Sequence, residues 1–325
     1  MKTKFAIGCL VQWYEIEIIE EYLESLTDAI DSAKNTDVII DLTFITNQDL
    51  EEIEGANMVD IISRWREIIT LLNDKGYKVY DKFEYRLHTI ADYRRLFNAN
   101  YCNDVDVLIW GESDALLPKQ MFTILDNLHK TSLQNNNPKY LAFFGMCKMW
   151  DDSWKPLEHP DFTDKPFIEM DTKNWWSLRY TMNKDEMNKI NDKTNELDVR
   201  IMPQHKFNGC GLVISSEVIK SGVNIPKSVF FVHEDSAFMF MTNKVLGNIP
   251  QYVIKNILLV HNRKHPNKRM YIKGEKGIDK TDPGAQRRTH KWYSIANKMC
   301  EENYRNLFNP NYKSFTWQNV FKEIK

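Results

Sequence analysis

Apolar, β-branched runs alternate with segments of helical periodicity through the first third of the chain, and this alternation constrains the fold more than any other feature. Four runs read as strands, at residues 4–11, 37–46, 78–85 and 106–110. Between them, apolar side chains recur at the spacing of one helix face, at residues 15–33, 61–72 and 89–101. Parallel strands need a long crossover, which a helix supplies. The alternation therefore predicts an α/β fold with a mostly parallel sheet flanked by helices.

The rest of the chain continues this pattern less regularly. Further strands are expected at residues 140–144, 207–215 and 252–260, and helices at 185–198, 216–221 and 291–304. Residues 149–176 are rich in Trp, Pro and Asp, which suits either a small core under a long loop or an aromatic wall for an acceptor sugar. We expect one domain over residues 1–260, with an acceptor-side insertion at 149–206, and a C-terminal extension over residues 261–325.

The C-terminal extension begins with a strongly basic segment. Residues 261–298 carry eleven Lys and Arg against three Asp and Glu, although the whole chain has a net charge of -2. Such a segment suits a lid that closes over a diphosphate, or a strip that contacts a nucleic-acid backbone. The near-neutral chain favours the lid.

Cysteine usage and hydropathy bear on the compartment. The five cysteines are scattered and form no Cys-x-x-Cys pair, which indicates neither a zinc site nor a disulfide framework. Glu15 and Glu17 interrupt the first apolar run before a signal-peptide core forms, and no window reaches the ~18 apolar residues of a membrane span. These features lead us to expect a soluble, cytoplasmic protein.

Two carboxylates follow the strand at 106–110. Glu112 and Asp114 stand one residue apart, and Pro118 then opens a helical pattern. Open α/β sheets place ligands at the carboxyl ends of their strands. Paired carboxylates there suit a divalent cation, because hard cations take oxygen ligands. The alternative is a charged loop after a core strand.

Three more polar features fall at ends of expected strands. They are the turn Asn208-Gly209-Cys210-Gly211, the pair Glu234-Asp235 after the apolar run 230–232, and His261 after the last strand. In this order, with a first strand and an acidic-x-acidic motif before them, they resemble the motifs of GT-A-type glycosyltransferases, and most closely the inverting family 2 group. The resemblance spans residues 4–265. It departs from the usual Asp-x-Asp motif at Glu112.

The resemblance implies a metal site and a catalytic base. Asp114, with Glu112 and His261, would bind Mn²⁺ or Mg²⁺ beside the phosphates of a nucleotide-sugar, where the ion acts as a Lewis acid. Asp235 would be the base that takes the acceptor hydroxyl proton, and Glu234 is the competing candidate. The alternative for this pair is a helix N-terminus that carries acids to suit the helix dipole.

Other residues are candidates for binding the nucleotide. A base could stack on Trp13 or Tyr14 in the loop after the first strand. One of Arg94 and Arg95 should face solvent by helical period, while the other could reach a phosphate. Arg263 and Lys264 stand beside His261, and Arg offers a fork that matches phosphate oxygens.

The resemblance implies a metal-dependent, inverting glycosyltransferase that moves a sugar from a nucleotide-sugar, expected to be a UDP-sugar, to an acceptor hydroxyl of a glycan or lipid-linked acceptor. Three alternatives stay open. A glycosyltransferase acting on modified bases in DNA would also explain the basic segment. A nucleotidyltransferase shares the layout, but the first strand offers Gly8 and no basic residue for a phosphate loop. A non-catalytic carbohydrate- or nucleic-acid-binding module would explain the departure at Glu112.

Overall fold

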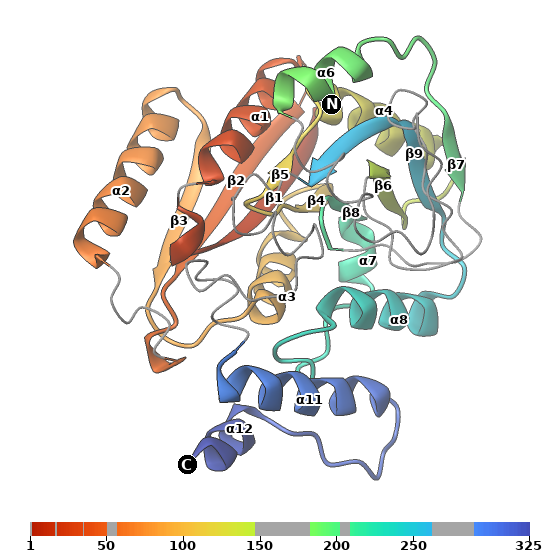
Figure 1. The fold of residues 1–325 in the computed structure, drawn as a ribbon. Helices are drawn as coiled ribbons and strands as arrows, with labels where there is room; N and C mark the ends of the chain where they lie inside the picture. Colours follow the sequence, from red (N-terminus) through yellow and green to blue (C-terminus); the bar gives the residue numbers. More distant parts are fainter. Residues whose placement is uncertain are drawn as a thin grey trace, which may run out of the picture.

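A twisted sheet with helices on both faces forms the body of the protein (Figure 1). The computed structural model describes residues 2–16, 18–34, 36–50, 57–146, 183–201, 209–261 and 289–325. Within these ranges the strand order is β3-β2-β1-β4-β8-β6-β9-β5, and β7 pairs with β9.

The N-terminal half of the sheet is parallel. β1 (Thr3–Gln12) lies between β2 (Thr36–Ile45) and β4 (Val107–Trp110), and β3 (Lys78–Glu84) extends the sheet beyond β2. The crossovers are α1 (Ile19–Asp31), α2 (Met58–Asp74) and α3 (Ile90–Tyr101). The predicted α/β architecture, a mostly parallel sheet flanked by helices, is confirmed.

The second half of the sheet reverses direction at β8 (Leu212–Ser215). β8 runs antiparallel to β4 and to β6 (Leu141–Met146), while β9 (Gln251–His261) runs parallel to β6. Because of this reversal, the start of β8 lies beside the end of β4, and Gly211 N donates to Trp110 O at 2.8 Å. The short strands β5 (Ala115–Leu116) and β7 (Val199–Ile201) pair antiparallel with β9.

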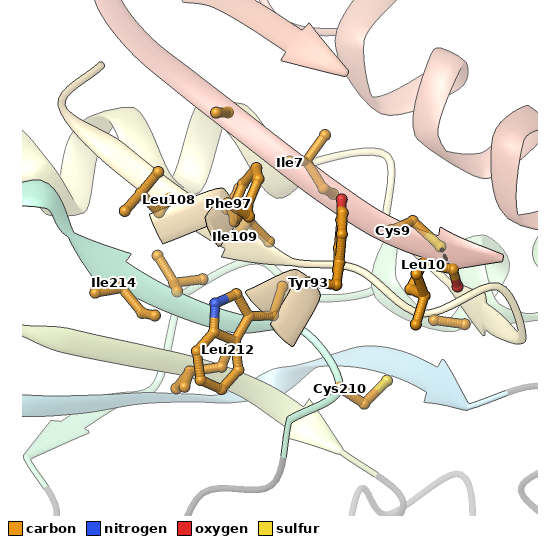
Figure 2. Packing of buried hydrophobic residues seen from close by; sticks show 14 of the residues in the cluster. Ile7, Cys9, Leu10, Tyr93, Phe97, Leu108, Ile109, Cys210, Leu212 and Ile214 are labelled. Carbon is orange, nitrogen blue, oxygen red and sulfur yellow. Dashed lines mark hydrogen bonds between the residues drawn. The ribbon is translucent and has the colours of Figure 1, made fainter. Parts of the chain in front are cut away.

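Different helices cover the two faces. On one face, Trp65 of α2 packs on Phe44 and Phe122 of α4 (Met121–Gln134) packs on Phe5. On the other face lies α3, whose Tyr93 and Phe97 pack against β1 (Figure 2). The approach of α3 requires Gly8, because a Cβ there would overlap the ring of Phe97 and the hydroxyl of Tyr93. Gly8 therefore serves helix packing.

Four helices follow β8 in the described part of the chain. α7 (Ser216–Lys220) comes directly after β8, and α8 (Glu234–Leu246) packs its Phe238 on Trp110, with ring centroids 5.1 Å apart. The C-terminal pair α11 (Lys291–Arg305) and α12 (Trp317–Ile324) lies below α8 in Figure 1. The helix predicted at 291–304 is confirmed, while α12 was not expected.

Two local predictions are wrong. Residues 230–232 form no strand: their apolar side chains pack on the C-terminal helices, where Phe231 contacts Trp292 and Trp317. The helix expected over 185–198 is α6 (Lys184–Asn191), which ends early. Most of the expected insertion 149–206 and of the basic segment 261–298 lies outside the described residues. No helix in the described part of the chain has both the length and the apolar character to span a membrane.

Candidate active site

A buried arginine connects three of the four polar features that the sequence singles out. Arg94 on α3 is 2% exposed, and its Nη2 donates to Glu112 Oε1 at 2.8 Å. Its Nη1 donates to Glu234 Oε1 at 2.7 Å, and Nη2 also donates to Gly209 O at 3.1 Å. The end of β4, the turn before β8 and the start of α8 therefore meet at one guanidinium.

The surroundings of Arg94 are shaped to hold it. Its Cζ lies 4.8 Å from the ring centroid of Trp110, and Trp110 Nε1 donates to Asn98 on the same helix at 2.9 Å. A Cβ at Gly209 would overlap the guanidinium, so glycine is required there. Burial alone would lower the pKa of Arg94, but the carboxylates of Glu234 and Glu112 raise it, so the side chain stays charged.

The predicted metal motif, Glu112 and Asp114, follows β4 through a tight turn. Gly111 N donates to Gly8 O at 2.7 Å, and a Cβ at Gly111 would overlap the Tyr22 hydroxyl. Asp114, 8% exposed, lies just before β5, and the β5–β9 ladder places the backbone of His261 opposite Ala115. The backbones of Asp114 and His261, distant in sequence, are therefore neighbours, although the His261 side chain is outside the described part.

The chemistry of this edge fits a divalent cation. The carboxylates of Glu234, Glu112 and Asp235 all act on Arg94, and those of Glu15, Glu112 and Asp114 raise the pKa of the buried Cys9 thiol beyond the effect of burial. Carboxylates thus outnumber the guanidinium, and a hard cation would offset the excess charge. Among the described side chains, no group of three or more His, Cys, Asp and Glu is arranged to hold a metal ion. The set Glu112, Asp114 and His261 stays a prediction.

The pair Glu234-Asp235 opens α8. Asp235 accepts from Gly209 N at 3.1 Å and from Ser236 N at 2.6 Å, which fixes its carboxylate. Burial and the neighbouring Asp235 raise the pKa of Glu234 to about 7, against the lowering by Arg94. The two acids are therefore distinct: Glu234 is committed to Arg94, and Asp235 to backbone N–H groups.

The candidates for nucleotide binding have different outcomes. Trp13 and Tyr14 form a 3₁₀ turn (Trp13–Glu15) after β1, with ring centroids 5.6 Å apart, and the buried Trp13 Nε1 has no hydrogen-bond partner among the described residues. Neither arginine of α3 faces solvent, contrary to the helical-period prediction. Arg95, 16% exposed, donates to backbone carbonyls of Ile225, Pro226 and Val229. Arg263 and Lys264 lie outside the described residues.

Sequence reasoning missed that Arg94 is the centre of the site. A signal was present: Ala91, Arg94 and Asn98 stand at helical spacing beside the apolar stripe of α3, and all three are buried. A charged residue on the packed side of a helix requires buried partners. The acids that pair with it, Glu112 and Glu234, come from other segments of the chain, which periodicity does not place.

Comparisons with known proteins give a likeness in fold. No protein-family model and no curated protein matches the chain. Among solved structures, S. aureus TarS in complex with UDP-GlcNAc is 10% identical over 95% of this chain and 73% of that chain, with a TM-score of 0.44. GalNAc-T7 with UDP, GalNAc and Mn²⁺ is 12% identical over 99% of this chain and 54% of that chain, with a TM-score of 0.47. UDP-glucose pyrophosphorylase complexed with UDP-glucose is 10% identical over 78% of this chain and 90% of that chain, with a TM-score of 0.35. At these values, activity has to be argued from the site itself.

Proposed function

We propose that the protein is a metal-dependent, inverting glycosyltransferase that uses a nucleotide-sugar donor, with a UDP-sugar as the first candidate. The observation that carries the proposal is the convergence of Glu112, Glu234 and Gly209 on the guanidinium of Arg94. An acidic edge beside the end of a parallel strand is where an open α/β sheet takes its ligand. The same edge supplies both an acidic motif for a cation and a second carboxylate pair for proton transfer.

Each residue has a role in the proposed reaction. Asp235 accepts the proton of the acceptor hydroxyl as that oxygen bonds to the anomeric carbon. The bond from the anomeric carbon to the diphosphate oxygen breaks, and the nucleoside diphosphate leaves with the electron pair. Glu112, Asp114 and His261 would hold Mn²⁺ or Mg²⁺, which supplies Lewis-acid stabilisation of charge on the leaving group when it is bound.

Arg94 and Glu234 have a supporting role. Arg94 is engaged in ion pairs that hold Glu112 and Glu234 in fixed positions. Arg263 and Lys264 are therefore the remaining candidates for contact with the phosphates. Trp13 Nε1, which has no hydrogen-bond partner among the described residues, would offer a donor in the loop proposed to bind the nucleotide base. An acceptor could be a glycan, a lipid-linked hydroxyl or a modified base in nucleic acid.

The nucleotidyltransferase alternative loses support at Gly8. That residue gives Tyr93 and Phe97 room to pack, and it lies inside the sheet, in register with Asp41 of β2 and Trp110 of β4. A phosphate loop needs glycines whose backbone N–H groups are open to the ligand.

The test is to incubate the protein with UDP-, GDP- and dTDP-sugars and Mn²⁺ and to measure released nucleoside diphosphate. We expect slow hydrolysis of at least one donor, and thermal stabilisation by that donor which depends on Mn²⁺. Absence of both effects for every donor would overturn the proposal. Once an acceptor is found, Asp235→Asn should leave donor binding intact and lower transfer by roughly 10²- to 10⁴-fold. Loss of donor binding would instead assign Asp235 to the metal or nucleotide.

A further inference from the structure

The segment before α8 delivers the acidic pair without support from the sheet. Residues 226–233 contain neither a strand nor a helix, and Glu234 follows them directly. A chain that pairs with no strand must be fixed by other contacts if it is to present two carboxylates in one orientation. The contacts that fix this segment come from two helices on opposite sides.

On the first side, α3 binds the backbone of the segment. Arg95 Nη2 donates to Val229 O at 2.6 Å and to Pro226 O at 3.0 Å. Thr89, which caps α3, donates from Oγ1 to Phe230 O at 2.8 Å. These bonds hold the first part of the segment and stop short of the acidic pair.

On the second side, α11 contacts the segment at Ser228 and at the two residues next to the acidic pair. Asn303 Nδ2 donates to Ser228 O at 2.8 Å, and Cys300 Sγ donates to Val232 O at 3.1 Å. The ring of Tyr304 stacks on His233, with centroids 5.2 Å apart and planes 16° apart. The last two residues before Glu234 are therefore each held by a side chain from α11.

The backbone conformation of His233 needs support from surrounding contacts. Its φ of 66° and ψ of 21° lie in the left-handed region, although it has a Cβ, and no side-chain cap bond is present at this start of α8. A non-glycine residue in this region costs free energy and persists when its surroundings impose it. The same turn sets the direction in which α8 begins, and with it the placement of Glu234 and Asp235.

We propose that Tyr304 and Cys300 of α11 are positioning residues that hold the turn at His233 and thereby orient the carboxylates of Glu234 and Asp235. This inference rests on the proposed function for its kinetic consequence, but its structural part stands alone. The acids are near enough to act on both residues. Burial raises the pKa of Tyr304 and Asp235 raises it further. Burial likewise raises the pKa of Cys300, and Glu234 adds to that effect.

The kinetic test compares Tyr304→Leu, which removes the stacked ring, with Tyr304→Phe, which keeps it. With a donor identified by the screen proposed above, we expect Tyr304→Leu to lower kcat by about tenfold or more, while donor KM stays within about twofold, because a misplaced base costs rate rather than binding. Tyr304→Phe should stay near wild type. The matched control is Phe308→Leu, at an aromatic residue that contacts Phe240 of α8 and is 45% exposed. An equal loss in Phe308→Leu would overturn the proposal.

The second test needs no substrate and separates the two proposals. The carboxyl titration of Glu234 is followed by ¹³C NMR and assigned by its absence in Glu234→Gln. Its environment comprises Arg94 from α3, Glu112 after β4 and Asp235 on α8. We expect the midpoint to move in Tyr304→Leu and in Cys300→Val, and to stay in Tyr304→Phe and in Cys300→Ser, which keeps a donor for Val232 O. If the wild-type protein has no donor activity but the Glu234 midpoint moves in these variants, the proposed function is contradicted and the positioning role stands. An unchanged Glu234 midpoint in both Tyr304→Leu and Cys300→Val would contradict the positioning role.

Discussion

Arg94 Nη1 and Glu234 Oε1 lie 2.7 Å apart, although 140 residues separate them in the chain. Arg94 is 2% exposed and Glu234 13% exposed, so this ion pair is largely withdrawn from water. Removing one partner of such a pair leaves the other charge buried and uncompensated, which costs more than the pair itself contributes. The stability of the acidic site should therefore depend on Arg94 more than on any surface arginine.

Arg94→Ala should lower the free energy of unfolding by about 3–5 kcal/mol, because Glu112 and Glu234 would both lose their buried partner. Urea denaturation followed by circular dichroism measures this change. Arg64→Ala is the matched control: Arg64 pairs with Glu67 but is 44% exposed, so its loss should cost about 1 kcal/mol or less. Similar costs for both variants would contradict a buried hub at Arg94.

The raised pKa of Glu234 predicts a specific dependence of stability on pH. Burial and Asp235 raise the pKa of Glu234 from its ordinary 4.5 to about 7. The folded state then binds the proton more tightly than the unfolded state, so this group's contribution is present below pH 4.5 and is lost as pH rises through about 7. The full loss amounts to about 3 kcal/mol.

Glu234→Gln isolates that contribution, because the amide keeps the shape and does not titrate. Between pH 4.5 and 8 the wild type should lose stability relative to Glu234→Gln, and the two should run parallel above pH 8. Denaturation curves at half-unit steps of pH measure the difference. A wild type that gains stability over this range relative to the variant would show that Arg94 outweighs burial at Glu234.

Gly111 and Tyr22 offer a rescue experiment at the turn before the metal motif. A Cβ at Gly111 would overlap the Tyr22 hydroxyl, which is buried and has no hydrogen-bond partner among the described residues. Gly111→Ala should therefore cost about 1–3 kcal/mol through overpacking. Tyr22→Phe removes the obstructing oxygen at little cost, since that oxygen makes no hydrogen bond within the described part of the chain. The double variant should recover much of the loss in thermal unfolding, and an additive double variant would mean that the overlap is relieved elsewhere.

The periodicity of apolar residues predicted the strands and the helix whose apolar faces pack against the core. The parallel strands β1, β2 and β4 and the helix α3 lie within about two residues of their predicted bounds, because a strand or helix buried against a core must repeat its apolar side chains. The run at 230–232 shows the limit of that argument: it is apolar because Phe231 meets Trp292 and Trp317 from the chain's end, and a local pattern cannot tell such partners from a strand neighbour.

The sequence predicted the acidic residues of the candidate site but not the arginine that joins them. Glu112, Asp114, Glu234 and Asp235 stand out because carboxylates break apolar runs in the sequence. The spacing of Arg94 on α3 hints at its burial, but its partners come together only because the reversal at β8 brings Gly209 beside the end of β4. Long-range pairing of this kind depends on topology, which one sequence does not display.

Asp114→Asn tests the metal motif. Asp114 is 8% exposed and lies beside the strand pairing that places the His261 backbone opposite Ala115. An amide keeps the shape of the side chain and removes the negative charge that attracts a cation. We expect this variant to fold, to lose the thermal stabilisation that Mn²⁺ gives together with a donor, and to release nucleoside diphosphate at a rate that no longer depends on Mn²⁺. Asp37→Asn is the control, because Asp37 pairs with Lys78 at the start of β2, away from the carboxyl ends of the parallel strands. If Asp114→Asn keeps the full response to Mn²⁺, the cation is held by other groups, and Glu112 becomes the residue to replace next.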